Sequence, residues 1–401
     1  MLELEAALHR ILAAMPPAQP ERLSLHQAHR RFLAERIVSP LELPGFDNSA
    51  MDGYAVRAED LWKATSTSPV ALHVKGRVAA GEIFSGEVTT GSCVRLFTGS
   101  PVPRGADAVV MQEDTRADPG QPGTIWFLDS IKPWENIRFR GEDLKSGAVL
   151  GDMGTELTAG RLSLLNAVGL THLNAGRQPL TGVLVTGSEL VEAGQPRTPG
   201  KIYESNRLGL ATLISEAGAI QKMFPLVKDT LADTRAALEM AFAECDVVVS
   251  SGGVSVGELD FIKSAFEQMG GELEFWKVAI RPGRPFVFGR CGTKFLFGLP
   301  GNPVSAFVTF LLLVRPALLR WQGATTVSLP VQHGVLAEAL SNPDDRRHFM
   351  RVVIDPSGKV RSAGAQASHL LSSLAIANGL LDLPPRTALA FGASVPVLRW
   401  S

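Results

Sequence analysis

The run Asp246–Lys263, DVVVSSGGVSVGELDFIK, places an apolar stretch before a serine and glycine loop and an acidic residue. Val247 to Val249 suit a buried parallel strand, and we expect the strand to end before Ser250-Ser251-Gly252-Gly253. Glycines let unpaired backbone N–H groups approach a ligand, and the N-terminus of a following helix adds roughly half a positive charge. The run therefore favours a phosphate or similar oxyanion. Taken alone, it also fits an ordinary strand-to-helix turn with Asp260 as N-cap.

Two further apolar runs end in loops of the same kind. One leads into LPGNPVSAF, Leu299–Phe307, where Asn302 is a candidate cap and Pro303 fits the first helical position. The other is Val183–Thr186, which ends in Thr186-Gly187-Ser188-Glu189. In an open parallel sheet the carboxyl ends of the strands line one crevice, which is where ligands bind. Three such ends predict a binding site there.

Basic residues flank a Pro-Gly break in FWKVAIRPGRP, Phe275–Pro285. Cations usually just solvate a surface, but a turn beside two anion-binding loops favours phosphate recognition, with arginine able to bond bidentately. We interpret Lys277 and Arg281 in this way. For Arg284 both interpretations stay open.

Five more segments complete a resemblance that covers nearly the whole chain. They are LPGFDNSAMDGYAV (Leu43–Val56), RLFTGSPVPRGADAVVMQE (Arg95–Glu113), RGEDLKSG (Arg140–Gly147), VTGSEL (Val185–Leu190) and KIYESN (Lys201–Asn206). Each short motif is common by itself, but their number and order make the match specific. The chain resembles the molybdopterin molybdenumtransferases, the MoeA proteins, whose eukaryotic relative is the E domain of gephyrin.

The resemblance implies a reaction and a set of site residues. Adenylylated molybdopterin and molybdate would bind together, the metal would enter the dithiolene, and Mg²⁺-dependent cleavage would release AMP and molybdenum cofactor. The implied catalytic residues are Asp52, Asp143, Glu189, Asp260, Lys277 and Arg281, with Glu189 and Asp260 as metal ligands. The implied ligand-binding residues are Thr98, Thr186, Gly187, Asp229, Ser251, Gly252, Gly253, Ser255, Arg284, Pro300, Gly301, Asn302, Pro303 and Ser305.

Taken one at a time, the acidic residues favour structural roles, such as a turn-forming Asp52 before Gly53. Carboxylates beside a pyrophosphate repel it unless a divalent cation intervenes, and Mg²⁺ needs only one or two carboxylates in addition to substrate phosphates. By resemblance, Asp143, Glu189 and Asp260 position metal and water, while Lys277 and Arg281 hold anionic ligands. The two glycine loops would then face the pterin phosphate.

These residues must be positioned by a multidomain fold that combines α/β and β parts. Leu4, Leu8, Ile11 and Met15 share one helical face, and a second helix is expected over Leu25–Val38. Strands are expected at 71–74, 93–97, 108–111 and 125–128, and helices at 159–168, 207–217 and 234–245. From Leu180 the alternation of strands and helices predicts a three-layer α/β domain with a mostly parallel sheet, and the tail predicts a small β barrel or sandwich.

With the family fold added, the expected domains are an N-terminal helical region (1–42 and 148–178), an inserted β domain (43–147), a molybdopterin-binding α/β domain (179–326) and a C-terminal β barrel (327–401). Family members are dimers whose cleft joins the α/β domain of one subunit to the Asp52 and Asp143 region of the other. The resemblance also implies a molybdopterin adenylyltransferase and molybdoenzyme maturation factors as partners.

Composition excludes several other classes. The 401 residues carry a net charge of -1, which gives no footprint for nucleic acid or an anionic membrane. Cys93, Cys245 and Cys291 are widely spaced and fit no metal pattern, so we expect thiols in a reducing compartment. The acidic start lacks a signal peptide's basic flank, and the longest apolar stretch, Ala306–Val314, is too short to span a bilayer. We therefore expect a cytoplasmic protein.

Two positions depart from the family pattern. Ser188 stands where an aspartate is usual, which leaves Glu189 to make more of any metal contact. In the tail, Gln366 and Ser368 match, but His369 replaces the usual glycine. The alternatives are a molybdopterin adenylyltransferase, which has the same α/β fold but usually lacks the flanking domains, and a non-catalytic scaffold of the gephyrin type. The choice between molybdate and tungstate stays open, as does whether Arg346, Arg347 and Arg351 bind ligand or only solvate a strand.

Overall fold

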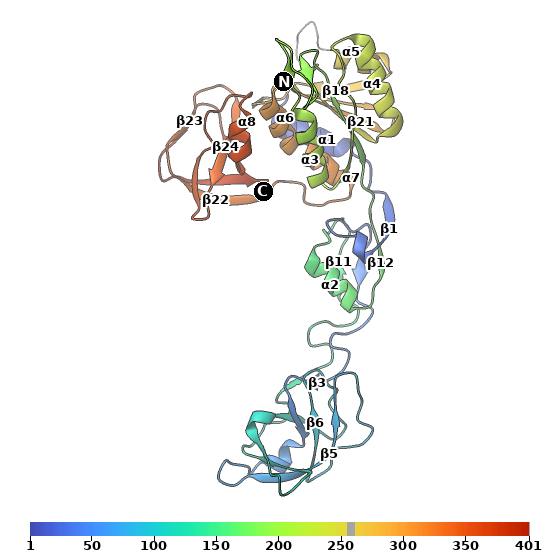
Figure 1. Ribbon diagram of the computed structural model, residues 1–401, viewed down its shortest axis with the longest axis vertical. Helices are drawn as coiled ribbons and strands as arrows, with labels where there is room; N and C mark the ends of the chain where they lie inside the picture. Colours follow the sequence, from blue (N-terminus) through green and yellow to red (C-terminus); the bar gives the residue numbers. More distant parts are fainter. Residues whose placement is uncertain (255–260, 401) are drawn as a thin grey trace. The chain divides into compact units, whose positions relative to one another are not determined.

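The protein is described by a computed structural model that covers residues 1–254 and 261–400 (Figure 1). It divides into two compact units. Unit 1 consists of Met1–Glu35, Met153–Ala159 and His172–Ser401, and unit 2 of Arg36–Asp152 and Gly160–Thr171. The finer division into four domains stays a prediction.

Unit 1 is built on a six-stranded sheet. Its strands, in spatial order, are β16 (Ile220–Met223), β13 (Leu180–Val185), β17 (Val247–Ser251), β21 (Lys294–Leu299), β20 (Val287–Cys291) and β18 (Glu272–Trp276). The first four run parallel, and β20 and β18 add antiparallel pairs at one edge. The parallel strands are apolar because helices cover both of their faces.

Strand β17 is longer than the sequence predicts. Ser250 and Ser251 continue it, with Ser251 beside Val185 of β13 and Leu299 of β21. The prediction that the strand stops at Val249 is wrong because the buried Ser251 hydroxyl donates a hydrogen bond to the Pro300 carbonyl, which satisfies its polar group inside the sheet.

Helices pack on both faces of this sheet. One face carries α1 (Leu4–Ala14), α3 (Asn206–Glu216), α6 (Pro303–Thr309), the π-helical turn η4 (Phe310–Val314) and α7 (Arg315–Trp321). The other face carries α4 (Leu231–Glu244) and α5 (Ile262–Gln268). In Figure 1, α4 and α5 lie to one side of β21 and α3 and α6 to the other. These layers agree with the α/β pattern expected after Leu180.

The apolar stretch from α6 to α7 is longer than the sequence analysis allows. Pro303–Trp321 has 19 residues and is long and apolar enough to cross a membrane by length and composition, so the limit set at Val314 is wrong. However, 83% of this window is buried inside the protein, which is the property of a helix in a packed core.

Of the two helices predicted near the N-terminus, the first is confirmed and the prediction of the second is wrong. Helix α1 buries Leu4 and Ile11 and ends before the prolines at 16 and 17. The helix expected over Leu25–Val38 is replaced by the short 3₁₀ turn η1 (Leu25–Gln27) and bridges to distant segments. Residues in this region pair with backbone about 140 positions away, as in the Leu33 bridge to Ala175, and such tertiary pairing overrides local helical preference.

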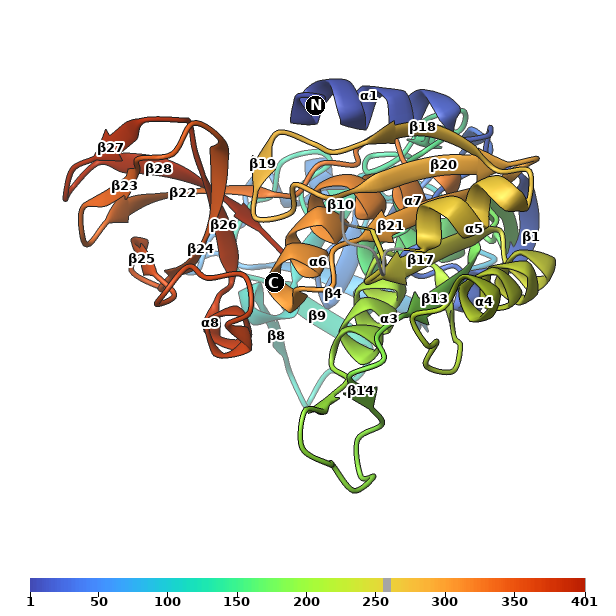
Figure 2. The same cartoon turned by 90° about the horizontal axis from the view of Figure 1, so that it is seen from above.

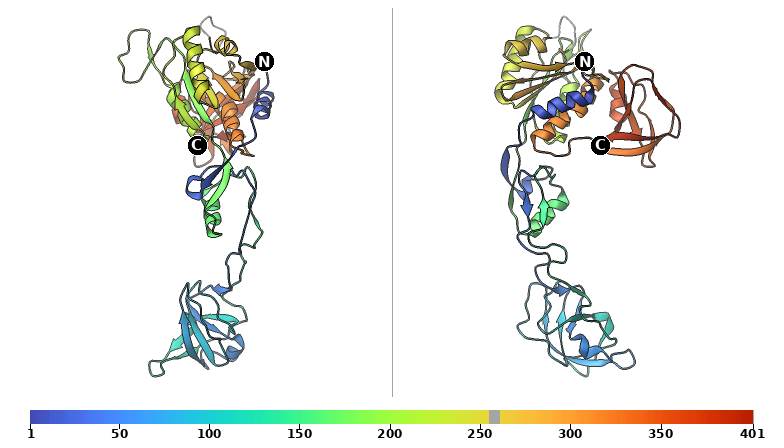
Figure 3. Two further views of the ribbon diagram at one scale, coloured as in Figure 1. Left: turned by 90° about the vertical axis from the view of Figure 1, so that its right-hand side faces the viewer. Right: turned by 180° about the vertical axis from the view of Figure 1, so that it is seen from behind.

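The tail of unit 1 is a closed barrel, which decides between the two predicted forms. Its strands are β22 (Val331–Leu336), β24 (Arg347–Ile354), β25 (Lys359–Ser362), β26 (Gly379–Leu383) and β28 (Ser394–Arg399), and β26 pairs back to β24. Smaller elements of unit 1 are β1 (Pro20–Ser24), β12 (His172–Gly176), β14 (Leu190–Val191), β15 (Ile202–Tyr203), β19 (Ile280–Arg281), β23 (Leu340–Asn342), β27 (Thr387–Leu389) and α8 (Leu371–Ile376). The barrel lies beside the α/β layers (Figure 2), and the segment between β14 and β15 projects from them (Figure 3).

Unit 2 is a curled six-stranded sheet. In spatial order it contains β7 (Ala108–Met111), β4 (Gly53–Val56), β6 (Ser92–Leu96), β5 (Val70–Val78), β9 (Thr124–Phe127) and β8 (Thr115–Ala117). Smaller elements are β2 (Ile37–Val38), β3 (Asn48–Ser49), β10 (Ile137–Arg138), β11 (Val149–Gly151), η2 (Ala58–Leu61), η3 (Gln112–Asp114) and α2 (Ala159–Ala167). The four strands expected in this region and the helix at 159–168 are confirmed.

The start of β17 is fixed by the half-buried carboxylate of Asp246, which gives a stability prediction. Asp246 accepts hydrogen bonds from Arg177 Nη1 and Nη2 at 2.8 and 3.0 Å and from the Leu180 N–H at 2.9 Å. Burial opposes ionisation of Asp246, but these bonds prevail and hold its pKa below the usual value. We expect Asp246→Asn to lower the free energy of unfolding by about 1–2 kcal/mol at pH 7.

The pH dependence of this loss tests its cause. Because the pKa of Asp246 is lowered on folding, its stabilising effect is present above the unfolded-state value of 3.8 and is lost as the pH falls through the folded-state pKa. Urea denaturation of wild type and Asp246→Asn between pH 7 and 2.5 should show a difference that shrinks in this acid range. A difference independent of pH would contradict the electrostatic explanation.

Candidate functional site

A pocket of about 650 Å³ lies at the carboxyl ends of β13, β17 and β21. Its lining includes predicted ligand-binding residues from all three loops, namely Thr186, Gly187, Ser251, Gly252, Gly253, Pro300, Gly301, Asn302, Pro303 and Ser305, together with Asp229, which follows β16, and the predicted metal ligand Glu189. The structure thus brings the three loops together around one space, as the parallel arrangement of these strands requires.

Backbone conformation shapes the loop after β17. Gly252 and Gly253 have φ angles of +91° and +65°, in the region that L side chains rarely adopt. A Cβ on Gly252 would lie 2.5 Å from the Thr186 carbonyl oxygen. Glycine therefore permits the loops after β13 and β17 to approach one another, and the pocket exists because they do.

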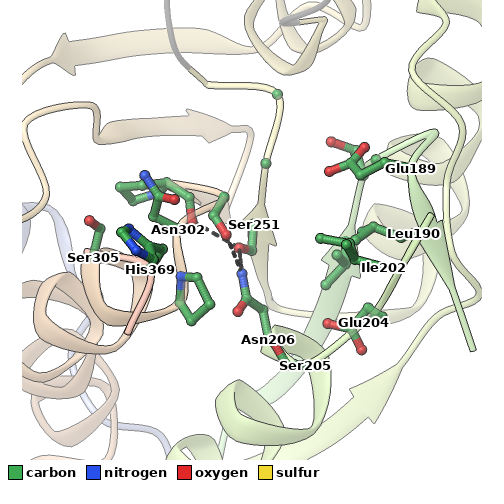
Figure 4. A pocket seen from close by; sticks show the side chains of 18 of the residues that line it. Glu189, Leu190, Ile202, Glu204, Ser205, Asn206, Ser251, Asn302, Ser305 and His369 are labelled. Carbon is green, nitrogen blue, oxygen red and sulfur yellow. Dashed lines mark hydrogen bonds between the residues drawn. The ribbon is translucent and has the colours of Figure 1, made fainter. Parts of the chain in front are cut away.

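Asn206, at the first residue of α3, joins the loops. Its Nδ2 donates to Ser251 Oγ at 2.9 Å and to the Gly301 carbonyl at 2.7 Å (Figure 4). The Thr186 hydroxyl beside them is buried and has no hydrogen-bond partner in the described part of the chain. A buried hydroxyl without a partner costs free energy, so a polar ligand group at this position would be favoured.

The acidic wall contains three carboxylates with different surroundings. Asp229 Oδ2 accepts from the Ser188 N–H at 2.7 Å, and Ser188 Oγ accepts from the Asp229 N–H at 3.1 Å. Glu204 accepts from the Arg207 N–H and so caps α3. Glu189 has no such structural bond in the described residues, and Figure 4 shows its side chain on the wall opposite Asn302. Ser188, the departure from the family pattern, therefore holds Asp229 in place.

The opposite wall comes from α6 and the segment before α8. Figure 4 shows His369 beside Asn302 and Ser305. The Val304 N–H donates to the Ser368 carbonyl at 3.1 Å, which ties this segment to the start of α6. Asn302 occupies the N-cap position and Pro303 the first turn, as expected, but the Asn302 side chain makes no capping bond and lines the pocket instead.

The predicted basic residues do not line this pocket. Lys277 has a φ of +91°, and its Nζ lies 4.2 Å from the centre of the Trp276 ring. Arg281 forms an ion pair with Asp344. Arg284 is exposed and does not line the pocket. Trp276 connects the two regions, because its Nε1 donates to the Val254 carbonyl of the glycine loop at 3.0 Å.

A buried basic cluster lies near Arg281 on the barrel. Arg351 is 0% exposed, and its Nη2 donates to the carbonyls of Ala365 and Ala367, while Nε and Nη1 have no partner in the described residues. Burial, followed by the charges of Arg281, Arg351 and Arg346, lowers the pKa of the buried His348 to about 4. Arg351 therefore does not solvate a strand, and its free N–H groups suit an oxyanion.

The remaining predicted residues lie elsewhere. In unit 2, Asp52 accepts from the backbone N–H and the hydroxyl of Thr98, each at 2.8 Å, and these two bonds lower the pKa of Asp52. Asp143 is exposed on a loop of the same unit. Ser255 and Asp260 fall outside the described residues, so their predicted roles stay predictions.

Sequence reasoning missed several lining residues. Chief among them are Leu190, Ile202, Tyr203, Glu204 and Asn206. All lie in or next to the VTGSEL and KIYESN segments. A polar residue between an apolar strand and a helix, such as Asn206, is the signal that could have been used.

Fold and site define a multidomain protein with a ligand pocket at the strand ends of an α/β domain. Three family models match it: the MoeA N-terminal region (domain I and II) over residues 2–169, a probable molybdopterin binding domain over 182–320, and the MoeA C-terminal region (domain IV) over 333–400.

Full-length relatives agree. The chain is 41% identical over 389 residues to the molybdopterin molybdenumtransferase of Haemophilus influenzae, covering 96% of this chain and 94% of that protein. It is 40% identical over 382 residues to molybdopterin molybdenumtransferase 2 of Mycobacterium tuberculosis, covering 94% of each. The crystal structure of the molybdopterin biosynthesis MoeA protein from Pyrococcus horikoshii matches all of both chains with a TM-score of 0.86 at 32% identity.

The chain belongs to the MoeA family of molybdopterin molybdenumtransferases. It is therefore an enzyme of molybdenum cofactor biosynthesis.

Proposed function

We propose that the chain inserts molybdate into adenylylated molybdopterin and releases AMP and molybdenum cofactor. The pocket at the ends of β13, β17 and β21 supports this proposal, because its glycine loops present backbone N–H groups and its size suits a pterin joined to a nucleotide. The observation that favours it most is the junction made by Asn206, which fixes two phosphate-binding loops against each other.

The donor set of the pocket fits Mg²⁺. The Glu189 carboxylate makes no hydrogen bond or ion pair with the described residues, and it faces the pocket. The described residues contain no group of three or more His, Cys, Asp or Glu that could hold a metal ion by itself. Mg²⁺ is usually bound by one or two carboxylates and by substrate phosphates, so it does not require such a group. Glu189 and Asp260 would hold the ion, which would neutralise charge on the phosphoanhydride.

The chain's own groups then have distinct roles. The N–H groups of Gly253, Gly301 and Asn302 bind the phosphates, and Asn206 keeps the two loops in register. Asp229, oriented by Ser188, contacts the nucleotide side of the ligand. Arg281 and Arg351 attract molybdate to the barrel side, where Arg351 offers free N–H groups. Lys277, near the glycine loop through Trp276, would complete the anion site.

The assembled enzyme is a homodimer in this proposal. Asp52, Thr98 and Asp143 lie in unit 2 and would complete the site of the partner subunit. We propose that the dimer acts in the cytoplasm, receives its substrate from a molybdopterin adenylyltransferase and passes its product to molybdoenzyme maturation factors.

AMP release tests the proposal. Purified protein, Mg²⁺ and adenylylated molybdopterin should release AMP in a molybdate-dependent way, measured by chromatography. Glu189→Gln should lower the rate at least roughly 100-fold, because it removes a charge that acts in the transition state. Glu192→Gln is the matched control, since Glu192 lies on the same segment but pairs with Arg207 outside the pocket lining. Equal rates for wild type and Glu189→Gln would contradict the assignment.

A further inference from the structure

A second pocket of about 680 Å³ lies in unit 1 and shares no lining residue with the first. Its walls come from the end of α3, the turn η4, the segment 329–332 that enters the barrel, and Arg399 and Trp400 near the end of the chain. The proposed reaction makes no use of this pocket, although it is as large as the site at the strand ends.

The lining has an excess of positive charge. The lining contains three arginines, Arg30, Arg315 and Arg399, and one carboxylate, that of Glu216. Arg315 Nη1 donates to the Val327 carbonyl at 3.0 Å, which fixes one side of its guanidinium. Arg399 Nη1 donates to Gln332 Oε1 at 2.7 Å. In the described residues Arg315 uses only Nη1, for the Val327 and Ser328 carbonyls, so its other N–H groups can donate to an oxyanion.

The positive charge of Arg315 is unfavourable in these surroundings. Burial lowers the pKa of Arg315; the charge of Glu156 opposes this effect, and the charge of Arg30 adds to it. Arg30 has an exposed side chain and a φ of +60°, which is unfavourable for a residue other than glycine. Two arginines close enough to repel one another would be stabilised by a bound anion.

The other side of the pocket is apolar. Leu213 of α3, Phe310 and Leu311 of η4 and the ring of Trp400 line it. Trp400 is positioned by edge-to-face packing on Phe307, with ring centres 5.4 Å apart. A fixed aromatic face beside three guanidinium groups suits a flat molecule that bears an oxyanion.

The π-helical turn provides an independent observation. Such turns are rare, occur mostly as single turns within α-helices and are frequent at functional sites. The turn Phe310–Val314 supplies two lining residues and directly precedes Arg315. An additional residue in a turn rotates the side chains that follow by about 100°. The turn therefore determines the direction in which Arg315 projects.

We infer that this pocket is a second ligand site, which binds a flat aromatic molecule carrying a phosphate group, of the nucleoside monophosphate class. The arginines bind the phosphate, and the ring lies against Trp400.

Fluorine NMR of the full chain tests the inference. The protein contains six tryptophans. After labelling with 5-fluorotryptophan, a Trp400→Phe variant identifies the Trp400 signal. AMP should shift this signal saturably, whereas adenosine should not, and inorganic phosphate should bind at least tenfold more weakly than AMP. AMP at the strand-end pocket would instead affect Trp276, which bonds to Val254, so the two sites are read separately.

Variants of the pocket decide the outcome. Arg315→Gln and Arg399→Gln should each raise the AMP dissociation constant at the Trp400 signal at least tenfold. Arg320→Gln is the matched control, because Arg320 lies on α7 but is exposed and outside the lining. Thermal unfolding checks that each variant is folded. If Arg315→Gln does not fold, the AMP dissociation constant of Arg399→Gln tests the inference instead. An unmoved Trp400 signal at 10 mM AMP, or an equal effect of Arg320→Gln, would overturn the inference. Phosphate binding as tight as AMP would remove the role of the aromatic wall.

Discussion

Gly252→Ala is expected to abolish ligand binding at the strand-end pocket. The substitution places a Cβ 2.5 Å from the Thr186 carbonyl oxygen and 2.9 Å from the Thr186 hydroxyl, and it does so at a φ of +91°. Adopting this conformation costs a non-glycine residue about 1 kcal/mol, and the contact with backbone adds strain that only movement of the loops can relieve. Moving them separates the N–H groups that the proposed phosphate contacts require.

The prediction is tested by measuring both the AMP affinity and the thermal stability of Gly252→Ala. AMP affinity at the strand-end pocket should fall at least roughly 100-fold, since several oriented hydrogen bonds are lost together. The midpoint of thermal unfolding should fall as well. The fluorine signal of 5-fluorotryptophan at Trp276 gives the AMP affinity of the strand-end pocket alone, and calorimetric unfolding gives the stability.

Gly200→Ala is the control that separates the strain of a positive φ from the steric clash between the loops after β13 and β17. Gly200 has a φ of +82°, but nothing lies within 4 Å of its Cβ position. We expect a loss of about 1 kcal/mol in stability and unchanged binding. If Gly252→Ala behaved like Gly200→Ala, the close approach of the two loops would not be what forms the pocket.

The features that could be predicted from the sequence are local ones. The apolar runs of β13, β17 and β21 lead into loops that contain glycine, and each run is visible within a few residues, although β17 extends two residues beyond its predicted end. Their parallel pairing follows from the alternation of strands and helices, so the meeting of three loops could be predicted. The start of α6 at Pro303 could also be predicted from the sequence.

Features that depend on distant segments were missed. The region after Leu25 reads as helix, but its backbone pairs with residues near 156 and 175, and no local pattern shows this. Arg281 reads as a ligand for the strand-end loops, yet it pairs with Asp344 on the barrel. The burial of Arg351 could not be predicted from the sequence either, because a basic residue in a strand ordinarily faces solvent.

Arg351→Met is expected to remove molybdate binding on the barrel side while leaving the fold intact. Arg351 is fully buried and forms no ion pair with the described residues, and two of its nitrogens have no hydrogen-bond partner. A buried charge in this state is costly, so an oxyanion that neutralises it stabilises the folded chain. Methionine has a similar volume and removes both the charge and the orphan donors.

The expected result is a difference in stabilisation by ligand. Molybdate should raise the unfolding temperature of the wild type in a concentration-dependent way, and Arg351→Met should lose this increase. The stability of the variant without ligand should stay within about 2 kcal/mol of wild type, because the lost bonds to two carbonyls are offset by removal of the unpaired groups. Sodium chloride at equal ionic strength controls for screening.

Arg347→Met is the matched control, and His348 gives a second measurement. Arg347 pairs with Glu5 and Asp382, so its loss should lower stability but preserve the molybdate-dependent increase. Since positive neighbours contribute to holding the pKa of His348 at about 4, a bound anion should raise that pKa, as measured by NMR titration of its ring protons. An unchanged pKa of His348 in saturating molybdate, together with equal stabilisation of wild type and Arg351→Met, would show that the anion binds away from this cluster.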